Sequence, residues 1–413
     1  MKPTRADLDE RFASPSYFVD PYDVYRQARA EAPIYWSELF HGWVVTKHAD
    51  VVRTKRDFDN FGNSGRYGKY VDRLPEDVRK EMGPLYEAWD TGIMHADPPH
   101  HTFLRNIMMR ALTPKMMRAM EERVFELLDE ALDKVVPNEP FDFVETVAGP
   151  LPCTIVADLI GVPAETQPTF RKWASDITEF VIRPNVEVAW RTRATILEAK
   201  AWLERLMEER RAEPREDLIT AFACMEEDGR RMSTVDALSN ARTIMVAGHG
   251  TTTSLLAVGL LSVLERPEVY AAIAEPVRAG DESPLKLAVE EMMRFESPLQ
   301  RDQRIVRQPV ELGGCAMSPG ELVFQMLGAA HRDEEVFDRP DDFVHDRNPN
   351  KHLAFGYGIH ACTGATLARI EARVVFKRLF ERFSKVELVE PREAVAWERS
   401  VVRLPKRLLV KVS

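Results

Sequence analysis

The sequence predicts a mainly α-helical protein with small β-sheets. Apolar residues recur at three- and four-residue steps over residues 124–136, 194–212 and 365–384, which is the pattern of amphipathic helices. Strand-like stretches are short and lie near the two ends of the chain, at residues 34–36 with 43–46, 310–312, 322–326 and 408–412. We therefore expect a large helical body with one small sheet formed by early and late segments.

A further segment, residues 243–264, contains no Asp, Glu, Lys or Arg in 22 residues, which is long enough to span a bilayer. It also contains three glycines, a histidine and six Ser or Thr residues. In a chain of which 30% is charged, this segment is better interpreted as a buried central helix.

No repeat or Gly/Ser-rich linker divides the chain, so we expect one domain over residues 1–413. Residues 61–95 are rich in Gly, Pro and charge, and we expect an irregular loop there. Loops of this length in a compact protein are usually functional, as a lid or a channel wall, or else disordered. The interpretation adopted for this one is a lid over a substrate pocket.

Composition excludes several classes of protein. The net charge of −10 argues against a nucleic-acid binder. The four cysteines are far apart, which argues against a zinc site or a disulfide framework. The N-terminus, MKPTRADLDERF, has no apolar core of a secretory signal. These features together predict a soluble cytoplasmic protein.

The run from Phe355 to Gly364, FGYGIHACTG, is the most informative part of the sequence. Its glycines predict a tight turn that passes close to another group. A helical pattern begins at Ala365, so Cys362 lies at a helix N-terminus, where the dipole stabilises a thiolate. Such a thiolate can serve as a nucleophile or a metal ligand, although a lone cysteine is more often structural.

The spacing FxxGxHxCxG resembles the haem-binding signature of the cytochrome P450 superfamily. The resemblance implies the cytochrome P450 fold, a single helical domain that encloses haem b. It makes Cys362 the axial ligand of the haem iron, with Phe355 shielding the thiolate. It further implies that Gly358 and Gly364 let the loop pass under the porphyrin and that His360 meets a haem propionate.

Further matches follow the order of the family. Glu291-Met-Met-Arg294 fits the ExxR element, an i, i+3 pair on one helix face. By resemblance, Glu291 and Arg294 form a structural ion network with Arg347.

The stretch DPPHHTFLR resembles the HxxxR element, in which both cations bind haem propionates. His101 and Arg105 inherit that role, and Arg304 is a third candidate. Planar guanidinium groups suit bidentate binding of carboxylates.

The segment AGHGTT resembles the family's oxygen-binding helix, but with a departure. The family's proton-delivering alcohol is present as Thr251, whereas the position of the acid is Gly250. Because Gly248 and Gly250 each weaken a helix by roughly 1 kcal/mol, we expect the helix to open locally. Three routes stay open: ordered water carries the protons, His249 carries them, or the enzyme uses peroxide or another chemistry.

The substrate pocket implied by the resemblance is mostly apolar, which favours a small or medium apolar organic substrate, aromatic ones included. Its candidate residues are Trp89, Ile93, Met94, residues 178–182, Met245, Val246, Ala247, Leu299 and Gln300. Candidate anchors for a substrate carboxylate are Arg66, Arg183 and Arg301.

The chain carries no flavin or iron–sulfur pattern, so electrons are expected from NAD(P)H through a separate ferredoxin and its reductase. Two segments near the expected haem are locally basic and would attract an acidic ferredoxin. Their cations are Arg110, Lys115, Arg118, Arg369, Arg373, Lys377 and Arg378.

Two classes of function are therefore compared. The first is a haem-thiolate monooxygenase that inserts one atom of O₂ into its substrate, with hydroxylation or O-dealkylation as the outcome. The alternative, suggested by Gly250, is a peroxide-using enzyme or a haem-thiolate protein that binds ligands without turnover. Thr251 and the glycines of its helix favour the monooxygenase.

Overall fold

The computed structural model describes residues 2–66, 68–72, 74–87, 91–182 and 185–413. It is mainly helical with small sheets, as the sequence predicts. The chain divides into two compact units. The first comprises residues 1–61, 121–152 and 250–413, and the second comprises residues 62–120 and 153–249. Helices α8, α9 and α13 contribute residues to both units.

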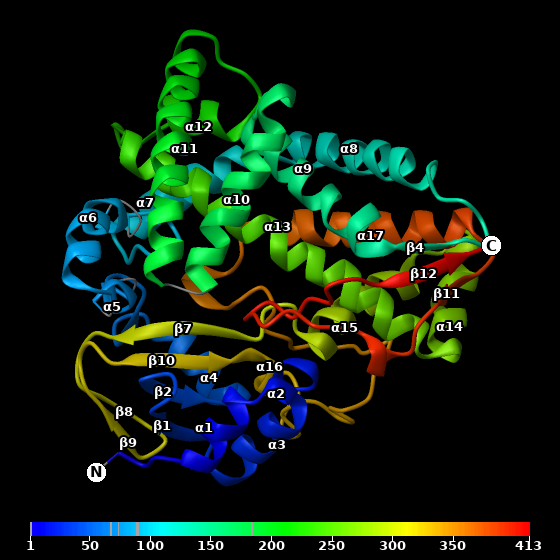
Figure 1. Cartoon of the computed structure of the whole chain (residues 1–413), viewed down its shortest axis with the longest axis horizontal. Coiled ribbons are helices and arrows are strands. Elements are labelled where there is room, and N and C mark those ends of the chain that lie inside the picture. The colour runs from blue at the N-terminus through cyan, green and yellow to red at the C-terminus, as the bar shows by residue number, and fades with distance from the viewer. Residues whose placement is uncertain (1, 67, 73, 88–90, 183–184) are drawn as a thin grey trace. The chain divides into compact units, whose positions relative to one another are not determined.

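The first unit contains a five-stranded sheet of order β1-β2-β10-β7-β3. Strand β2 (Gly42–Val45) pairs antiparallel with β1 (Ile34–Ser37) and parallel with β10 (Leu322–Met326). In Figure 1 the early strands are blue and the late ones yellow, and the two groups lie side by side. The predicted sheet of early and late segments is confirmed.

Some strands of this unit lack the apolar alternation by which a strand is predicted from sequence. Strand β7 (Arg301–Val306) pairs antiparallel with β10, but its first residues are polar and only its last three are buried. An apolar alternation is therefore absent over half of its length. The other strands of this unit are β3 (Phe61–Gly62), β4 (Pro140–Asp142), β8 (Val310–Leu312), β9 (Cys315–Met317), β11 (Val386–Leu388) and β12 (Leu409–Val412).

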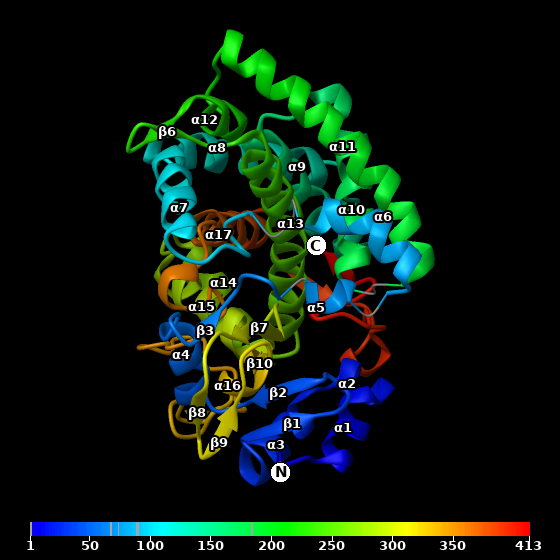
Figure 2. The ribbon, with the colours of Figure 1, turned by 90° about the vertical axis from the view of Figure 1, so that its left-hand side faces the viewer.

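The helices of the first unit that support the site meet at close range. Gly259 of α13 (Thr234–Leu264) is one contact point, because a Cβ there would lie 2.8 Å from Met292 Sδ and 3.3 Å from the Phe376 ring. Met292 belongs to α15 (Ser283–Glu296) and Phe376 to α17 (Ala365–Arg382). Figures 1 and 2 both place α14 (Pro267–Arg278) and α15 beside α17.

The remaining helices of this unit are short. They are α1 (Ala6–Ala13), α2 (Pro15–Val19), α3 (Tyr22–Glu31), α4 (His48–Arg56), α16 (Leu327–Ala330) and the single turns η1 (Val144–Ala148), η3 (Gly358–His360) and η4 (Arg392–Ala394). Residues 252–263 of α13 are all buried, which confirms the predicted central helix. Within the described ranges, α13 is long and apolar enough to cross a membrane, but 61% of its most apolar window is buried inside the structure.

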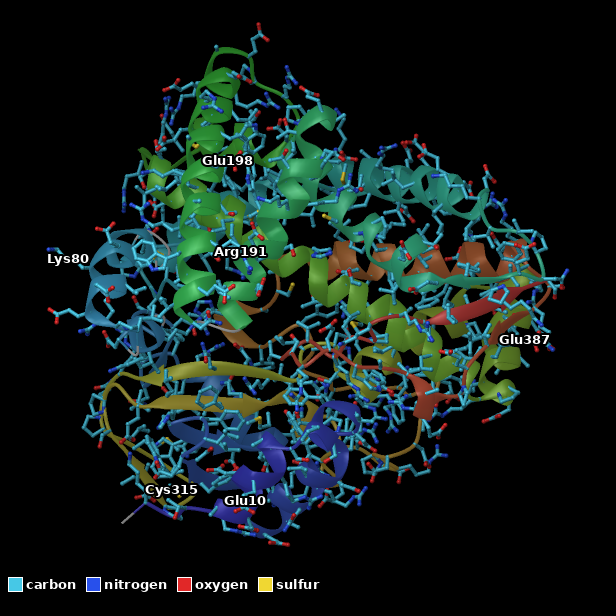
Figure 3. All side chains as sticks on the ribbon, viewed as in Figure 1. Glu10, Lys80, Arg191, Glu198, Cys315 and Glu387 are labelled. Atoms are coloured by element: carbon cyan, nitrogen blue, oxygen red, sulfur yellow. The ribbon has the colours of Figure 1, made fainter. Side chains whose placement is uncertain are left out.

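The second unit is helical except for one short hairpin. Its elements are α5 (Gly68–Val71), α6 (Glu76–Glu87), α7 (His100–Ala111), α9 (Pro150–Ile160), η2 (Ala164–Thr166), α10 (Gln167–Ile182), α11 (Val186–Ala212), α12 (Leu218–Cys224), β5 (Glu226–Glu227) and β6 (Arg230–Arg231). Trp173 of α10 and Trp202 of α11 pack with their ring planes tilted by 56° and their centroids 5.4 Å apart. Figure 3 labels Arg191 and Glu198 on α11, and Glu198 Oε2 accepts a hydrogen bond from Trp173 Nε1 at 3.1 Å.

Two predicted boundaries are wrong. Residues 61–95 are not a continuous irregular loop, because α5 and α6 lie within them. Helix α6 even contains Gly83 and Pro84, so these residue types do not exclude a helix here. Helix α8 (Pro114–Leu132) stops before Val136, which is 53% exposed and precedes Pro137. The residue before a proline is disfavoured in a helix, so the apolar periodicity runs past the helix end.

Candidate active site

Cys362 lies in the turn between η3 and α17, three residues before the helix begins. Its backbone N–H donates to Phe355 O at 2.8 Å, and the N–H of Ala361 donates to Gly358 O at 3.1 Å. These bonds close the loop into a compact turn. Cys362 is exposed, in contrast to the buried Cys153, and none of the four cysteines forms a disulfide.

The loop needs glycine at Gly358 for a reason that the fold itself supplies. Its φ is +72°, and a Cβ there would lie 2.7 Å from the backbone oxygen of Lys55 in α4. Gly364 differs, because its φ is −88° and a Cβ there would lie 3.8 Å from Cys362 Sγ. The backbone geometry thus requires glycine at Gly358 and allows a side chain at Gly364.

The chemistry of the donor set fits a haem. Within the described ranges, no three His, Cys, Asp or Glu side chains gather closely enough to hold a metal ion. Cys362 would therefore be a lone protein ligand. One thiolate is enough for a haem, because the porphyrin itself provides four nitrogen ligands to the iron. The guanidinium of Arg369 carries a positive charge in the same region. The hydrogen bond with Glu290, together with the charges of Glu290 and Cys362, raises the pKa of Arg369 against the effect of burial.

Arg304 lies on β7 and is 3% exposed. Its Nη1 is 3.2 Å from Asp302 Oδ2, and Lys55 Nζ lies 2.5 Å from the same oxygen. Two buried cations therefore converge on one carboxylate. His360 lies partly buried in η3 of the same unit.

His101 and Arg105 lie one turn apart on α7 of the second unit. Burial, with help from Arg105, lowers the pKa of His101 to about 4, although Asp97 acts in the opposite direction. His101 is therefore neutral at pH 7. A haem propionate beside His101 would act as Asp97 does and favour the cation, so the role of His101 at a propionate stays a prediction.

The structure brings Glu291, Arg294 and Arg347 together. Arg294 donates to both carboxylate oxygens of Glu291, at 2.7 and 2.8 Å, and neither side chain is exposed. Arg347 Nε donates to Glu291 Oε2 at 3.1 Å. Val344 N and Asn350 Nδ2 donate to the same carboxylate, which ties the segment before the cysteine loop to α15.

Several other charged side chains that anchor α15 could not be identified from the sequence. Glu290, next to Glu291, forms a bidentate pair with Arg369 and also meets His352. Glu296 at the end of α15 holds Arg403 at 2.7 Å and Arg392 at 2.8 Å. Adjacent glutamates on one helix are too common to indicate such roles without the fold.

Helix α13 is unbroken from Thr234 to Leu264, so the local opening expected at Gly248 and Gly250 is wrong. Each glycine costs about 1 kcal/mol, which the packing of a 31-residue helix outweighs. Among the described atoms, nothing lies within 4 Å of a Cβ placed at Gly250, whereas one at Gly248 would meet Val156 at 2.7 Å. Burial lowers the pKa of His249, so this imidazole is neutral at pH 7.

The predicted pocket residues differ in how far they are buried. Ile93 is buried and its N–H donates to Asn240 Oδ1 at 2.8 Å, whereas Met94 is 37% exposed. Thr251, Val246 and Ala247 are partly buried on α13. Trp89 and Arg183 lie outside the described residues, as do the side chains of residues 178 and 180–182.

The other predicted pocket residues form hydrogen bonds or packing contacts within their own units. The amide of Gln300 donates to Glu296 O and Ser297 O and accepts from Tyr25 at 3.0 Å. Leu299 packs in the core beside the sheet. Arg301 lies over the Phe40 ring at 4.8 Å, and the buried Arg66 donates to Met94 O.

An apolar cavity of about 90 Å³ lies within the second unit. It is bounded by side chains of α10, α11 and α13. They include Phe170, Trp173, Ile177, Trp202, Leu238 and Met245. Met245 is a predicted pocket residue, so the apolar character expected around it is present.

The cations expected to attract an acidic ferredoxin are paired with carboxylates. Arg369 pairs with Glu290, and Arg373 pairs with Glu121 and Glu282. The other pairs are Lys377–Glu282, Arg378–Asp129, Arg110–Glu227 and Lys115–Glu216. Acidic residues from distant segments therefore offset much of the charge of these locally basic segments, and their attraction of a ferredoxin stays a prediction.

Comparison with known proteins gives a consistent result. The family model for cytochrome P450 matches residues 79–412. The chain is 33% identical to the cytochrome P450 monooxygenase PikC of Streptomyces venezuelae, over 98% of this chain and 94% of that protein. Structures similar to this one include P450BioI in complex with an acyl carrier protein ligated to hexadec-9Z-enoic acid. The TM-score is 0.86 and the sequence identity 27%, and the match covers 96% of this chain and 100% of that one.

A second solved structure, CYP109E1 from Bacillus megaterium in complex with testosterone, has a TM-score of 0.81 and 29% identity and covers 95% of this chain and 99% of its own. The family model covers well over half of the chain, and the relatives match along nearly all of it. The fold, the thiolate turn and these matches lead to one conclusion. The chain belongs to the cytochrome P450 superfamily of haem-thiolate monooxygenases.

Proposed function

We propose that this enzyme inserts one atom of O₂ into a small or medium apolar organic substrate, by hydroxylation or O-dealkylation. The observation that carries the proposal is the turn of Cys362, a single exposed thiol at the start of α17. Apolar side chains at Ile93, Val246 and Ala247 support an apolar substrate. The testosterone and the fatty acyl group named for the two structural neighbours support it too, since both are largely apolar.

The cofactor is proposed to be haem b, held by Cys362. When bound, the haem supplies the activation of O₂ and the transfer of one oxygen atom. Arg304, His360, Arg105 and His101 would hold its propionates. The donor types support this assignment, since Arg304 and Arg105 are permanent cations and His101 and His360 carry ring N–H donors.

The remaining binding roles follow the family pattern. Phe355 would shield the thiolate, and Gly358 and Gly364 would let the loop pass beneath the porphyrin. The two compact units would form a single catalytic domain in the cytoplasm, with residues 61–95 as the lid of the substrate pocket.

Proton delivery is proposed to run through ordered water and Thr251. The open space at Gly250 supports room for such water. In an unbroken helix, residues two positions apart point to opposite sides, so His249 and Thr251 do not face each other. This geometry argues against a histidine relay to Thr251.

Electrons are proposed to come from NAD(P)H through a ferredoxin reductase and a ferredoxin. The cations of α17 are already paired with carboxylates, so ferredoxin would have to exchange or share those ion pairs. We therefore expect the association rate to fall only modestly as salt is raised.

The test begins with the spectrum of the reduced CO complex. The purified protein should bind one haem per chain and show the red-shifted Soret band of thiolate ligation, and Cys362→Ala should abolish that band. A normal thiolate spectrum in this variant would refute the ligand assignment.

Turnover is then measured with O₂, NAD(P)H and a generic ferredoxin system. The candidate substrates are compounds that shift the Soret band when they bind. Steady product formation supports the monooxygenase. The second candidate, a peroxide-using enzyme, is favoured by the missing acid at Gly250 and predicts that peroxide drives turnover far faster than the O₂ route. Ligand binding with turnover by neither route would indicate a non-catalytic haem-thiolate protein.

A further inference from the structure

Two adjacent carboxylates of α15 contact different segments next to the cysteine loop. Glu291 holds the segment before the loop through Val344, Arg347 and Asn350. Glu290 contacts His352, just before the loop, and Arg369 of α17, and no role follows for it from the ExxR element. The contacts of Glu290 indicate an electrostatic role for this carboxylate.

Glu290 makes three short polar contacts. Its Oε1 accepts from Arg369 Nε at 2.6 Å, and its Oε2 accepts from Arg369 Nη2 at 2.8 Å. Its Oε2 also lies 3.0 Å from His352 Nε2. Because Ala354 N donates to His352 Nδ1 at 3.3 Å, the proton of the neutral imidazole is on Nε2 and is donated to Glu290. The carboxylate is thus held from two sides.

Arg369 is fixed against the cysteine loop by a further contact. Its guanidinium lies over the ring of Phe355, 4.4 Å from the centroid, and Phe355 O accepts the N–H of Cys362. A bidentate partner and a stacked aromatic ring leave the planar group little freedom. The charge of Arg369 is therefore held in a constant position relative to the turn that carries Cys362.

We propose that Arg369 tunes the reduction potential of the iron bound by Cys362, and that Glu290 is the positioning residue that sets how much of the arginine's charge the thiolate experiences. This inference rests on the proposed role of Cys362 as haem ligand. It assigns new roles to Glu290, His352 and Arg369 and changes none of the binding roles proposed above.

The expected signs follow from electrostatics. One-electron reduction of ferric iron adds negative charge to the site, so a nearby cation favours the reduced form. Arg369→Gln removes the cation and should lower the potential. Glu290→Gln removes the counter-charge while Arg369 stays positive, and so should raise the potential. The double variant removes both charges and should lie near the wild type.

The experiment is a potentiometric titration of the holoprotein with dithionite as the electron donor, followed by its visible spectrum. At a fixed potential, Arg369→Gln should lower the ratio of ferrous to ferric protein at least threefold, and Glu290→Gln should raise it at least threefold. A threefold change corresponds to about 28 mV at 59 mV per tenfold for one electron. Arg369→Lys keeps the charge and should recover at least half of the loss.

Arg378→Gln is the matched control. Arg378 lies nine residues further along α17 and forms a similar bidentate pair, with Asp129 at 2.7 and 3.1 Å. Nine residues of helix place it about 13 Å further along the axis. Its potential should stay within the error of the wild type, because the effect depends on proximity to Cys362 and not on the loss of any ion pair.

The outcomes separate this inference from the proposed function. If the wild type shows no thiolate CO band, the haem assignment itself fails. If that band persists in both variants but their potentials shift in the same direction, or do not shift, the electrostatic role is refuted. A purely structural role for the ion pair predicts the same direction of change in both, together with loss of the thiolate band.

Discussion

Removing the buried carboxylate of Glu291 should destabilise the holoprotein more than any other single change in the ExxR network. Glu291 accepts five hydrogen bonds, two from Arg294 and one each from Val344, Arg347 and Asn350. Glu291→Ala removes all five. It leaves the guanidinium of Arg294, which is 0% exposed, without its counter-charge.

The magnitude follows from the burial of the pair. Arg294 would retain three carbonyl acceptors, His331 O, Pro340 O and Asp342 O, but no negative charge. Breaking a buried pair by removing one partner costs about 3–5 kcal/mol. Against a typical free energy of unfolding of about 5–15 kcal/mol, this is at least about a fifth of the total.

The assay is the urea concentration at which the haem spectrum and the helical circular dichroism are lost, together with the yield of haem-loaded protein. Glu291→Gln keeps the shape and one oxygen acceptor, so its midpoint should fall between those of the wild type and the Ala variant. The control is Glu126→Ala in α8, because Glu126 and Arg123 have the same i, i+3 spacing at 2.8 Å.

The control pair differs from the buried one in its exposure. Glu126 is 63% exposed, so its loss should cost no more than about 0.5 kcal/mol. If Glu291→Ala and Glu126→Ala shift the urea midpoint equally little, and both proteins load with haem fully, then the reasoning from burial is refuted.

Three further predictions follow. At Gly250 a Cβ meets open space, so Gly250→Glu should fold and improve the coupling of NAD(P)H to product relative to Gly250→Gln; equal coupling would exclude a role for the charge. Gly358→Ala should lower the urea midpoint of the helical circular dichroism, because Ala would need φ +72° and would approach Lys55 O at 2.7 Å. Gly364→Ala should leave this midpoint unchanged, and equal shifts in the two variants would contradict the turn geometry. Burial raises the pKa of Glu371 to about 8, above its unfolded value, so its neutral form stabilises the fold at low pH and that contribution is lost as the pH rises from about 4.5 through 8. Glu371→Gln should therefore flatten the fall in urea midpoint between pH 6 and pH 9, and an unchanged pH profile would show that Glu371 is not the cause.

The fold could be predicted from the sequence where apolar periodicity and burial coincide. The helix of residues 365–384 appears as α17 (Ala365–Arg382), and strands 310–312 and 322–326 appear as β8 and β10. Strand β7 could not be predicted in this way, since half of it is polar. Its place in the sheet depends on pairing with β10, which single-sequence periodicity does not report.

The site could be predicted in part. The residue types and spacing around Cys362 identified the loop, because few functions need that pattern of glycines with one cysteine. The glycines of α13 were misinterpreted, since a helix propensity of about 1 kcal/mol per glycine is small beside the packing of the whole helix. The ion pairs of the locally basic segments could not be predicted either, because their acidic partners, such as Glu121 and Asp129, come from distant parts of the chain.

The two adjacent glutamates of α15 should have different roles, Glu291 in the stability of the fold and Glu290 in the reduction potential. Glu291 is fully buried and holds backbone segments, so its loss should be measured mainly as unfolding. Glu290 is 25% exposed and its partner Arg369 is 43% exposed, so loss of their pair should cost little stability because solvent screens it. Glu290→Gln should therefore shift the reduction potential while leaving the urea midpoint near that of the wild type, and Glu291→Gln should do the reverse. If both variants lower the midpoint by similar amounts, the two neighbouring carboxylates form one structural cluster, and the separate electrostatic role of Glu290 is wrong.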